Sequence, residues 1–127
     1  AFAVKPGRAA IVLFGAPIIE EFFFMTGVFS LTYNLIGSRA RFAVATLVTS
    51  FAFMIYHAGV YGEASPFVFV YLFTERVAIC VADFSLTRRG FAPSILPGLI
   101  AHLGLNFSAY YQTCVAGTVQ LPAGGGC

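Results

Sequence analysis

Apolar residues fill four long stretches of the chain, and short polar segments separate them. The stretches lie at Ala9–Leu31, Phe42–Val60, Pro66–Phe84 and Ser94–Tyr111. Each has about 18–23 residues, the length that an α-helix needs to cross a hydrocarbon layer ~30 Å thick. A membrane β-barrel would need shorter segments of alternating polarity, and these stretches do not alternate. The pattern therefore predicts an all-α fold, a polytopic bundle of about four transmembrane helices.

The composition agrees with residence in a membrane. Of the 127 residues, 59% are hydrophobic and only 9% are charged, against about 25% charged residues in an ordinary soluble domain. The formal net charge of +2 and the lack of a basic stripe argue against nucleic-acid binding. The three cysteines, Cys80, Cys114 and Cys127, form neither a CxxC motif nor a disulfide framework. We expect an integral, multi-pass membrane protein surrounded by lipids.

A single domain accounts for most of the chain. We expect residues 1–112 to form a four-helix transmembrane core. Residues 113–127 show no hydrophobic periodicity and end in three glycines before the last cysteine. This composition predicts an irregular, glycine-rich C-terminal tail.

Polar side chains inside the apolar stretches are the candidates for function, because an ionisable group at the centre of a membrane helix costs at least ~2.5 kcal/mol. Glu20 and Glu21 lie in the middle of the first stretch, and His57 lies near the end of the second. His102 and Asn106 lie one helical turn apart in the fourth. With a rise of 1.5 Å per residue, three helices can bring these groups to one cavity.

Such a set of side chains suits the hydrolysis of a peptide bond. A glutamate shielded from water beside a histidine can activate a water molecule as a general base. A second imidazole and an amide can donate hydrogen bonds to the oxyanion that forms on the scissile carbonyl. Other hydrolase motifs are missing: there is no HExxH or GxSxG sequence, and Asp83 is the single aspartate.

Three motifs in chain order carry a family resemblance. They read Glu20-Glu21-Phe22-Phe23-Phe24-Met25, Phe53-Met54-Ile55-Tyr56-His57 and His102-Leu103-Gly104-Leu105-Asn106. The chain resembles the CPBP family of intramembrane glutamic proteases, which includes the type 2 CAAX prenyl proteases. The signature of that family is EExxxR on one helix, FxxxH on the next and HxxxN two helices later.

The resemblance implies a role for each matching residue. Glu20 would activate the water together with His57. His102 and Asn106 would form the oxyanion hole, and Glu21 would support the other groups. The resemblance also implies a membrane-associated peptide or a prenylated protein as the substrate, and a mechanism without a metal or another cofactor.

One position departs from the family signature, because Met25 stands where the family has an arginine. On an α-helix, position 25 lies one turn after Glu21, so the usual ion pair between them is missing. A buried carboxylate without a partner tends to take up a proton. We therefore hypothesise that Arg76, from the third stretch, pairs with Glu21 or Glu20. An arginine more than ~6 Å from both carboxylates would reject this hypothesis.

Two other interpretations of the same residues stay open. The chain could be a catalytically inactive, CPBP-derived structural subunit of a larger membrane complex, with other subunits as partners and haem or chlorophyll bound through His57 or His102. It could also be a zinc peptidase, because two histidines and Glu20 form a common zinc ligand set. An absorption band would favour the first interpretation and metal analysis would test the second.

Overall fold

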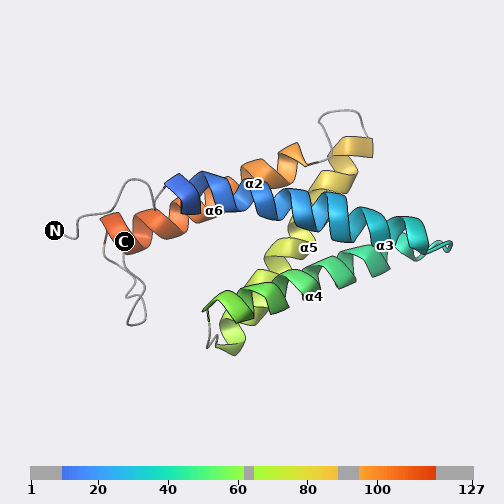
Figure 1. Ribbon diagram of the computed structural model, residues 1–127, viewed down its shortest axis with the longest axis horizontal. Helices are drawn as coiled ribbons and strands as arrows, with labels where there is room; N and C mark the ends of the chain where they lie inside the picture. Colours follow the sequence, from blue (N-terminus) through green and yellow to red (C-terminus); the bar gives the residue numbers. More distant parts are fainter. Residues whose placement is uncertain (1–9, 62–64, 89–94, 117–127) are drawn as a thin grey trace.

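The computed structural model describes residues 10–61, 65–88 and 95–116, and the regular structure in these ranges is helical throughout (Figure 1). Its elements are η1 (Ile11–Gly15), α2 (Ala16–Glu21), η2 (Phe22–Phe29), α3 (Ser30–Leu35), α4 (Arg41–Tyr61), α5 (Pro66–Arg88), α6 (Leu96–Tyr110) and η3 (Tyr111–Val115). The first four follow one another without a break and are called the N-terminal helix. The predicted all-α helical bundle is confirmed.

The apolar pattern locates the helices well but underestimates where three of them end. The structure ends them at Leu35, Arg88 and Val115, against predicted ends at Leu31, Phe84 and Tyr111. Hydrophobicity marks the part of a helix that suits a lipid environment, whereas backbone hydrogen bonds continue into the polar residues that follow. The predicted helix starts at Ala9 and Ser94 lie outside the described residues, as do residues 117–127 of the predicted tail.

The bundle has four helices, and each contacts its neighbours along part of its length. They are the N-terminal helix, α4, α5 and α6. In Figure 1, α6 lies along the first half of the N-terminal helix and α4 along its second half, while α5 contacts both α4 and α6. The N-terminal helix therefore contacts α6 up to the end of α2 and contacts α4 after it. The two adjacent glutamates lie at the end of α2.

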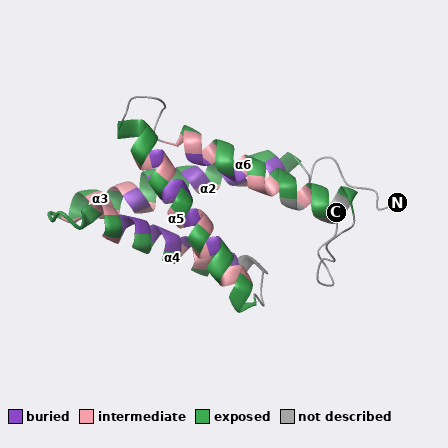
Figure 2. Cartoon of the chain, turned by 180° about the vertical axis from the view of Figure 1, so that it is seen from behind, coloured by how far each residue is buried: buried purple, intermediate pink, exposed green. Residues whose placement is uncertain are grey.

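The bundle buries polar side chains and exposes apolar ones. Figure 2 shows the buried residues gathered where the helices face one another. Among the residues whose side chains the structure describes, the buried polar ones are Glu21, Thr46, Thr49, Ser50, His57, Arg76, Asp83 and His102. Large apolar side chains point outward, with Phe67 as much as 79% exposed. An exterior of this kind suits lipid, since exposed apolar patches of this extent are rare on soluble monomers.

Among the residues that the structure describes, two helical segments are long and apolar enough to cross a membrane: Leu13–Leu35 and Arg41–Gly59. The other two rods are less apolar or shorter. The helix α5 carries Glu75, Arg76 and Asp83, and the helix α6 has 15 residues before its π-helical extension. Length and composition thus support two of the four predicted crossings.

The N-terminal helix is not a regular α-helix, because η2 follows directly after Glu21 as a π-helix. Ser30 Oγ donates a hydrogen bond to the carbonyl of Met25, five residues earlier, at 2.9 Å. In a π-helix the backbone bonds join residues five apart, so position 25 does not lie directly above Glu21. The assumption of α-helical spacing between these two positions is therefore wrong. Short π-helical stretches occur frequently at functional sites.

Candidate active site

The last turn of α2 presents two neighbouring carboxylates to different surroundings. Successive residues of an α-helix point about 100° apart, so Glu20 and Glu21 reach His102 from different sides, Glu20 at Nε2 and Glu21 at Nδ1. The Glu21 side chain is fully buried, whereas that of Glu20 is 13% exposed. Glu21 is thus placed to hold the site together, and Glu20 is the carboxylate that a small molecule can approach.

Glu20 meets one histidine from each of two other helices. Its Oε2 atom lies 3.7 Å from His57 Nε2, on α4, and 3.4 Å from His102 Nε2, on α6. The predicted convergence of Glu20, His57 and His102 is therefore found in the structure. Both distances exceed the 2.7–2.9 Å or so of a direct charge-assisted hydrogen bond. Loose contacts of this kind are common among catalytic groups before a substrate binds.

Both histidine rings are anchored through their Nδ1 atoms. His57 Nδ1 lies 3.0 Å from the carbonyl oxygen of Phe53, one turn earlier on α4. His102 Nδ1 lies 2.9 Å from Glu21 Oε1. In each case Nδ1–H donates, and the ring is held with Nε2 directed at Glu20. A fixed hydrogen bond on one ring nitrogen sets the orientation and role of the other.

Arg76 supplies the positive charge that position 25 lacks. Its Nη1 atom lies 2.8 Å from Glu21 Oε1, and neither side chain is exposed. The hypothesis that Arg76 pairs with Glu21 is confirmed. One carboxylate oxygen of Glu21 thus contacts both Arg76 and His102. Within the described residues, Glu21 Oε2 and the Nε and Nη2 atoms of Arg76 have no hydrogen-bond partner.

Phe53 is the first residue of the second motif, and the sequence alone does not reveal what its ring does. Its ring lies 4.0 Å from the His57 ring and 5.9 Å from the His102 ring, between centroids. The Arg76 guanidinium lies 3.9 Å from the centre of the same ring. A cation over an aromatic face is stabilised by the ring quadrupole. Phe53 therefore acts as the packing surface for three of the polar groups.

Two further polar residues, Asn106 and Glu75, lie close in the chain to residues of this cluster. Asn106 lies on α6 one turn beyond His102 and is half-buried. Glu75, next to Arg76 on α5, is also half-buried and interacts electrostatically with His102 and Glu20. Glu75 belongs to none of the three sequence motifs. Its proximity follows from the position of Arg76, its neighbour in the chain.

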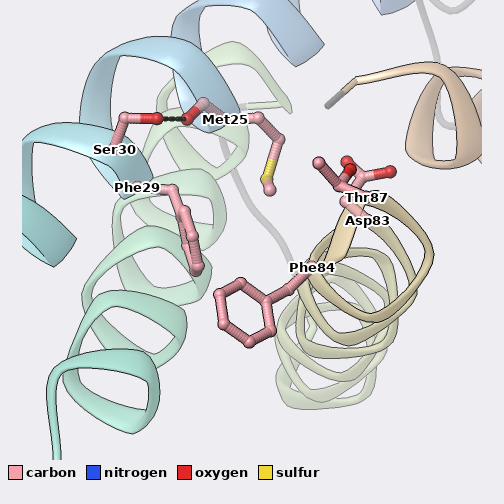
Figure 3. Close-up of a pocket in the computed structure, with 6 residues that line it drawn as sticks. All are labelled: Met25, Phe29, Ser30, Asp83, Phe84 and Thr87. Atoms are coloured by element: carbon pink, nitrogen blue, oxygen red, sulfur yellow. Dashed lines mark hydrogen bonds between the residues drawn. The ribbon is translucent and has the colours of Figure 1, made fainter. Parts of the chain in front are cut away.

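Neither of two cavities among the described residues is lined by Glu20, His57 or His102. One, of about 90 Å³, is lined by Met25, Phe29, Ser30, Asp83, Phe84 and Thr87 (Figure 3). The other, of about 520 Å³, lies on the outer face of α4 and α5 and is lined by Leu47, Val48, Phe51, Ala52, Ile55 and Phe73. A cavity shared by the catalytic candidates remains a prediction.

The described residues hold no group of three or more His, Cys, Asp or Glu side chains arranged to bind a metal ion. The zinc, haem and chlorophyll alternatives stay hypotheses.

Returning the family arginine to position 25 is expected to destabilise the protein. Met25 is 5% exposed and packs against Phe29, Ala45 and Cys80, with its sulfur 3.7 Å from the Cys80 thiol. Met25→Arg would place a second guanidinium among these apolar side chains and close to that of Arg76, a change that costs about 3–5 kcal/mol. Met25→Leu conserves volume and is expected to cost less than about 1.5 kcal/mol. Thermal unfolding of both variants in detergent measures the difference, and equal stabilities would contradict this prediction.

An apolar exterior around a buried carboxylate, arginine and histidine cluster defines a helical membrane protein with a potential hydrolytic site. The chain belongs to the type II CAAX prenyl endopeptidase Rce1-like family, whose model matches residues 4–108. The resemblance that the three motifs carry is therefore confirmed. The family consists of integral membrane, CAAX-type proteases with prenylated, membrane-associated protein substrates. No curated protein and no solved structure matches the chain.

Proposed function

We propose that the chain is an intramembrane glutamic endopeptidase that hydrolyses a peptide bond in the C-terminal tail of a prenylated protein, and that its four helices all cross the membrane. The observation that carries this proposal is the position of Glu20 Oε2, 3.7 Å from His57 Nε2 and 3.4 Å from His102 Nε2. A partly exposed carboxylate held between two oriented imidazoles is suited to bind and activate one water molecule.

The attacking water would bind between Glu20 and His57. Because His57 Nδ1–H is directed at the Phe53 carbonyl, Nε2 carries the lone pair that can accept one hydrogen of the water. The Glu20 carboxylate accepts the other hydrogen. As the water oxygen adds to the carbonyl carbon of the substrate, its proton passes to Glu20. The same proton then goes to the leaving nitrogen when the C–N bond breaks.

His102 would stabilise the negative charge that develops on the carbonyl oxygen. A carboxylate oxygen faces each of its ring nitrogens, so both nitrogens are best satisfied as donors. When Glu20 takes the proton of the water, the Nε2–H group of His102 is released to donate to the oxyanion. Donors placed in advance where charge develops are a major source of catalysis.

Asn106 would provide the second donor to the oxyanion. Because it lies one turn beyond His102 on α6, both side chains project from the same face of the helix. Asn106→Ala is expected to lower kcat by about 10²–10³-fold and to change KM little. Asn34→Ala, at an exposed position of α3, removes the same amide and is the matched control. A loss of similar size in both variants would contradict the assignment.

The substrate class is tested with purified protein in lipid vesicles. Two peptides of one CAAX sequence, one with a farnesylated cysteine and one without, are incubated with the protein and analysed by mass spectrometry. The isoprenoid partitions into the bilayer and concentrates the peptide beside the site, so we expect cleavage of the farnesylated peptide alone. No cleavage of either peptide, or equal cleavage of both, would refute the proposed function.

A further inference from the structure

The start of α6 is held by a side chain of α5. Asp83 is 1% exposed, and its Oδ1 atom accepts a hydrogen bond from the backbone N–H of Gly98, in the first turn of α6. The N–H groups of a first helical turn lack partners within the helix. Ile95, at the N-cap, has no polar side chain to satisfy them. A carboxylate at this end also interacts favourably with the helix dipole.

The same contact brings the backbones of α5 and α6 close together. A Cβ atom added to Gly98 would lie 2.5 Å from Asp83 Oδ2 and 2.7 Å from Ile79 Cγ2. Such distances leave no room for a side chain at position 98. If α6 slid or rotated against α5, it would break the hydrogen bond to Asp83 or clash with Ile79. The contact therefore fixes the depth of α6, meaning its position along α5, and the rotation of α6 about its own axis.

Two side chains of α5 fix the position of His102, each through another residue. Arg76 holds Glu21, which accepts from His102 Nδ1. Asp83 lies two turns further along α5 and holds Gly98, one turn before His102 on the same face of α6. His102 is thus fixed once through its ring and once through the backbone of its helix.

We propose that Asp83 is a positioning residue, which sets the depth and rotation of α6 through Gly98 and so holds His102 against Glu20 and Glu21. This inference deepens the proposed function and its kinetic consequences rest on it. Asp83 does not touch the reacting groups. The hydrogen-bond acceptor at its Oδ1 atom, rather than its charge, is the feature that the role requires.

Two substitutions separate the acceptor from the charge. Asp83→Asn keeps an oxygen that can accept from Gly98. Asp83→Ser is too short to reach, but its hydroxyl can bond to a carbonyl of its own helix, which protects folding. We expect kcat to fall about 10²-fold in the serine variant with KM little changed, because a shift of about 1 Å in a catalytic group has this effect. The asparagine variant is expected to retain most of its activity.

Thr87→Val is the matched control, since Thr87 lies one turn beyond Asp83 on α5 and lines the same cavity (Figure 3). Its kcat is expected to remain that of the unaltered protein. Equal losses in the asparagine and serine variants would overturn the proposal. A folded serine variant with unchanged kcat would overturn it as well.

A spectroscopic measurement tests the position of His102 without any substrate. The chain has two histidines, so a protein with ¹³C-labelled histidine gives two sets of ring signals, which His57→Gln assigns. Asp83→Ser and Gly98→Ala are expected to move the His102 signals and to leave those of His57, on α4, in place. Asp83→Asn should move neither.

Unchanged His102 signals in a folded Asp83→Ser protein would show that Asp83 contributes stability alone, which overturns the proposal. Displaced His102 signals in the Asp83→Asn protein would overturn the proposal too. This second measurement does not require that the serine variant folds. If the unaltered protein cleaves no prenylated peptide, the proposed function fails. The histidine signals still decide the role of Asp83 in that case.

Discussion

Glu20→Gln is expected to abolish proteolysis in a protein that still folds. The amide has the size of the carboxylate but cannot take a proton from water at neutral pH. Removal of a general base lowers a rate by about 10²–10⁴-fold. The fold should survive, because Glu20 is the partly exposed carboxylate of the pair and the buried contacts of Glu21 with Arg76 and His102 stay in place.

The matched control for this substitution is Glu75→Gln. It removes the same charge from a half-buried position that interacts electrostatically with His102 but has no part in the proposed mechanism. We expect this variant to retain most of its activity towards a farnesylated peptide. Retained activity in Glu20→Gln, or an equal loss in both variants, would show that Glu20 is not the general base.

Arg76→Met is expected to destabilise the protein by about 3–5 kcal/mol, because it leaves the Glu21 carboxylate buried without its positive partner. Both side chains of this pair are fully buried, and Arg76 Nη1 lies 2.8 Å from Glu21 Oε1. The double variant Glu21→Gln/Arg76→Met removes both charges, so we expect it to regain much of the lost stability. Its activity should stay low, because His102 Nδ1 no longer donates to a carboxylate.

Stability in this series is measured by thermal unfolding in detergent, and activity by cleavage of the farnesylated peptide. Arg41→Met is the control, since Arg41 is an exposed arginine placed over the Tyr33 ring and its loss should cost about 0.5–1 kcal/mol. A double variant as unstable as Arg76→Met would show that the two charges are not coupled. Recovery of activity in the double variant would show that Glu21 does not orient His102.

Much of the fold could be predicted from hydrophobicity, because lipid-facing helices need long apolar stretches. The π-helical segment η2 could not be predicted. The sequence Phe22–Phe29 suits an α-helix equally well, and the backbone bonding depends on how this segment packs against α4. The π-helical bonding changes the number of residues per turn after Glu21, which α-helical spacing does not take into account.

The site was partly predictable for a different reason. Glu20, His57 and His102 follow from three motifs in the right order, and Arg76 follows from electrostatics. A buried glutamate needs a positive partner, and Arg76 is the single arginine or lysine within the four predicted apolar stretches. The link between Asp83 and Gly98 has no counterpart in the sequence, because it depends on where α5 and α6 meet.

The central claim is that Glu20 activates a water molecule and does not itself attack the substrate. A single turnover in H₂¹⁸O, with the protein in excess over a farnesylated peptide, tests this claim most directly. Direct attack by water predicts one ¹⁸O atom in the new carboxyl terminus of the product and none in the segment of the protein that contains Glu20. Label in the Glu20 segment, or an unlabelled product, would contradict the proposed mechanism.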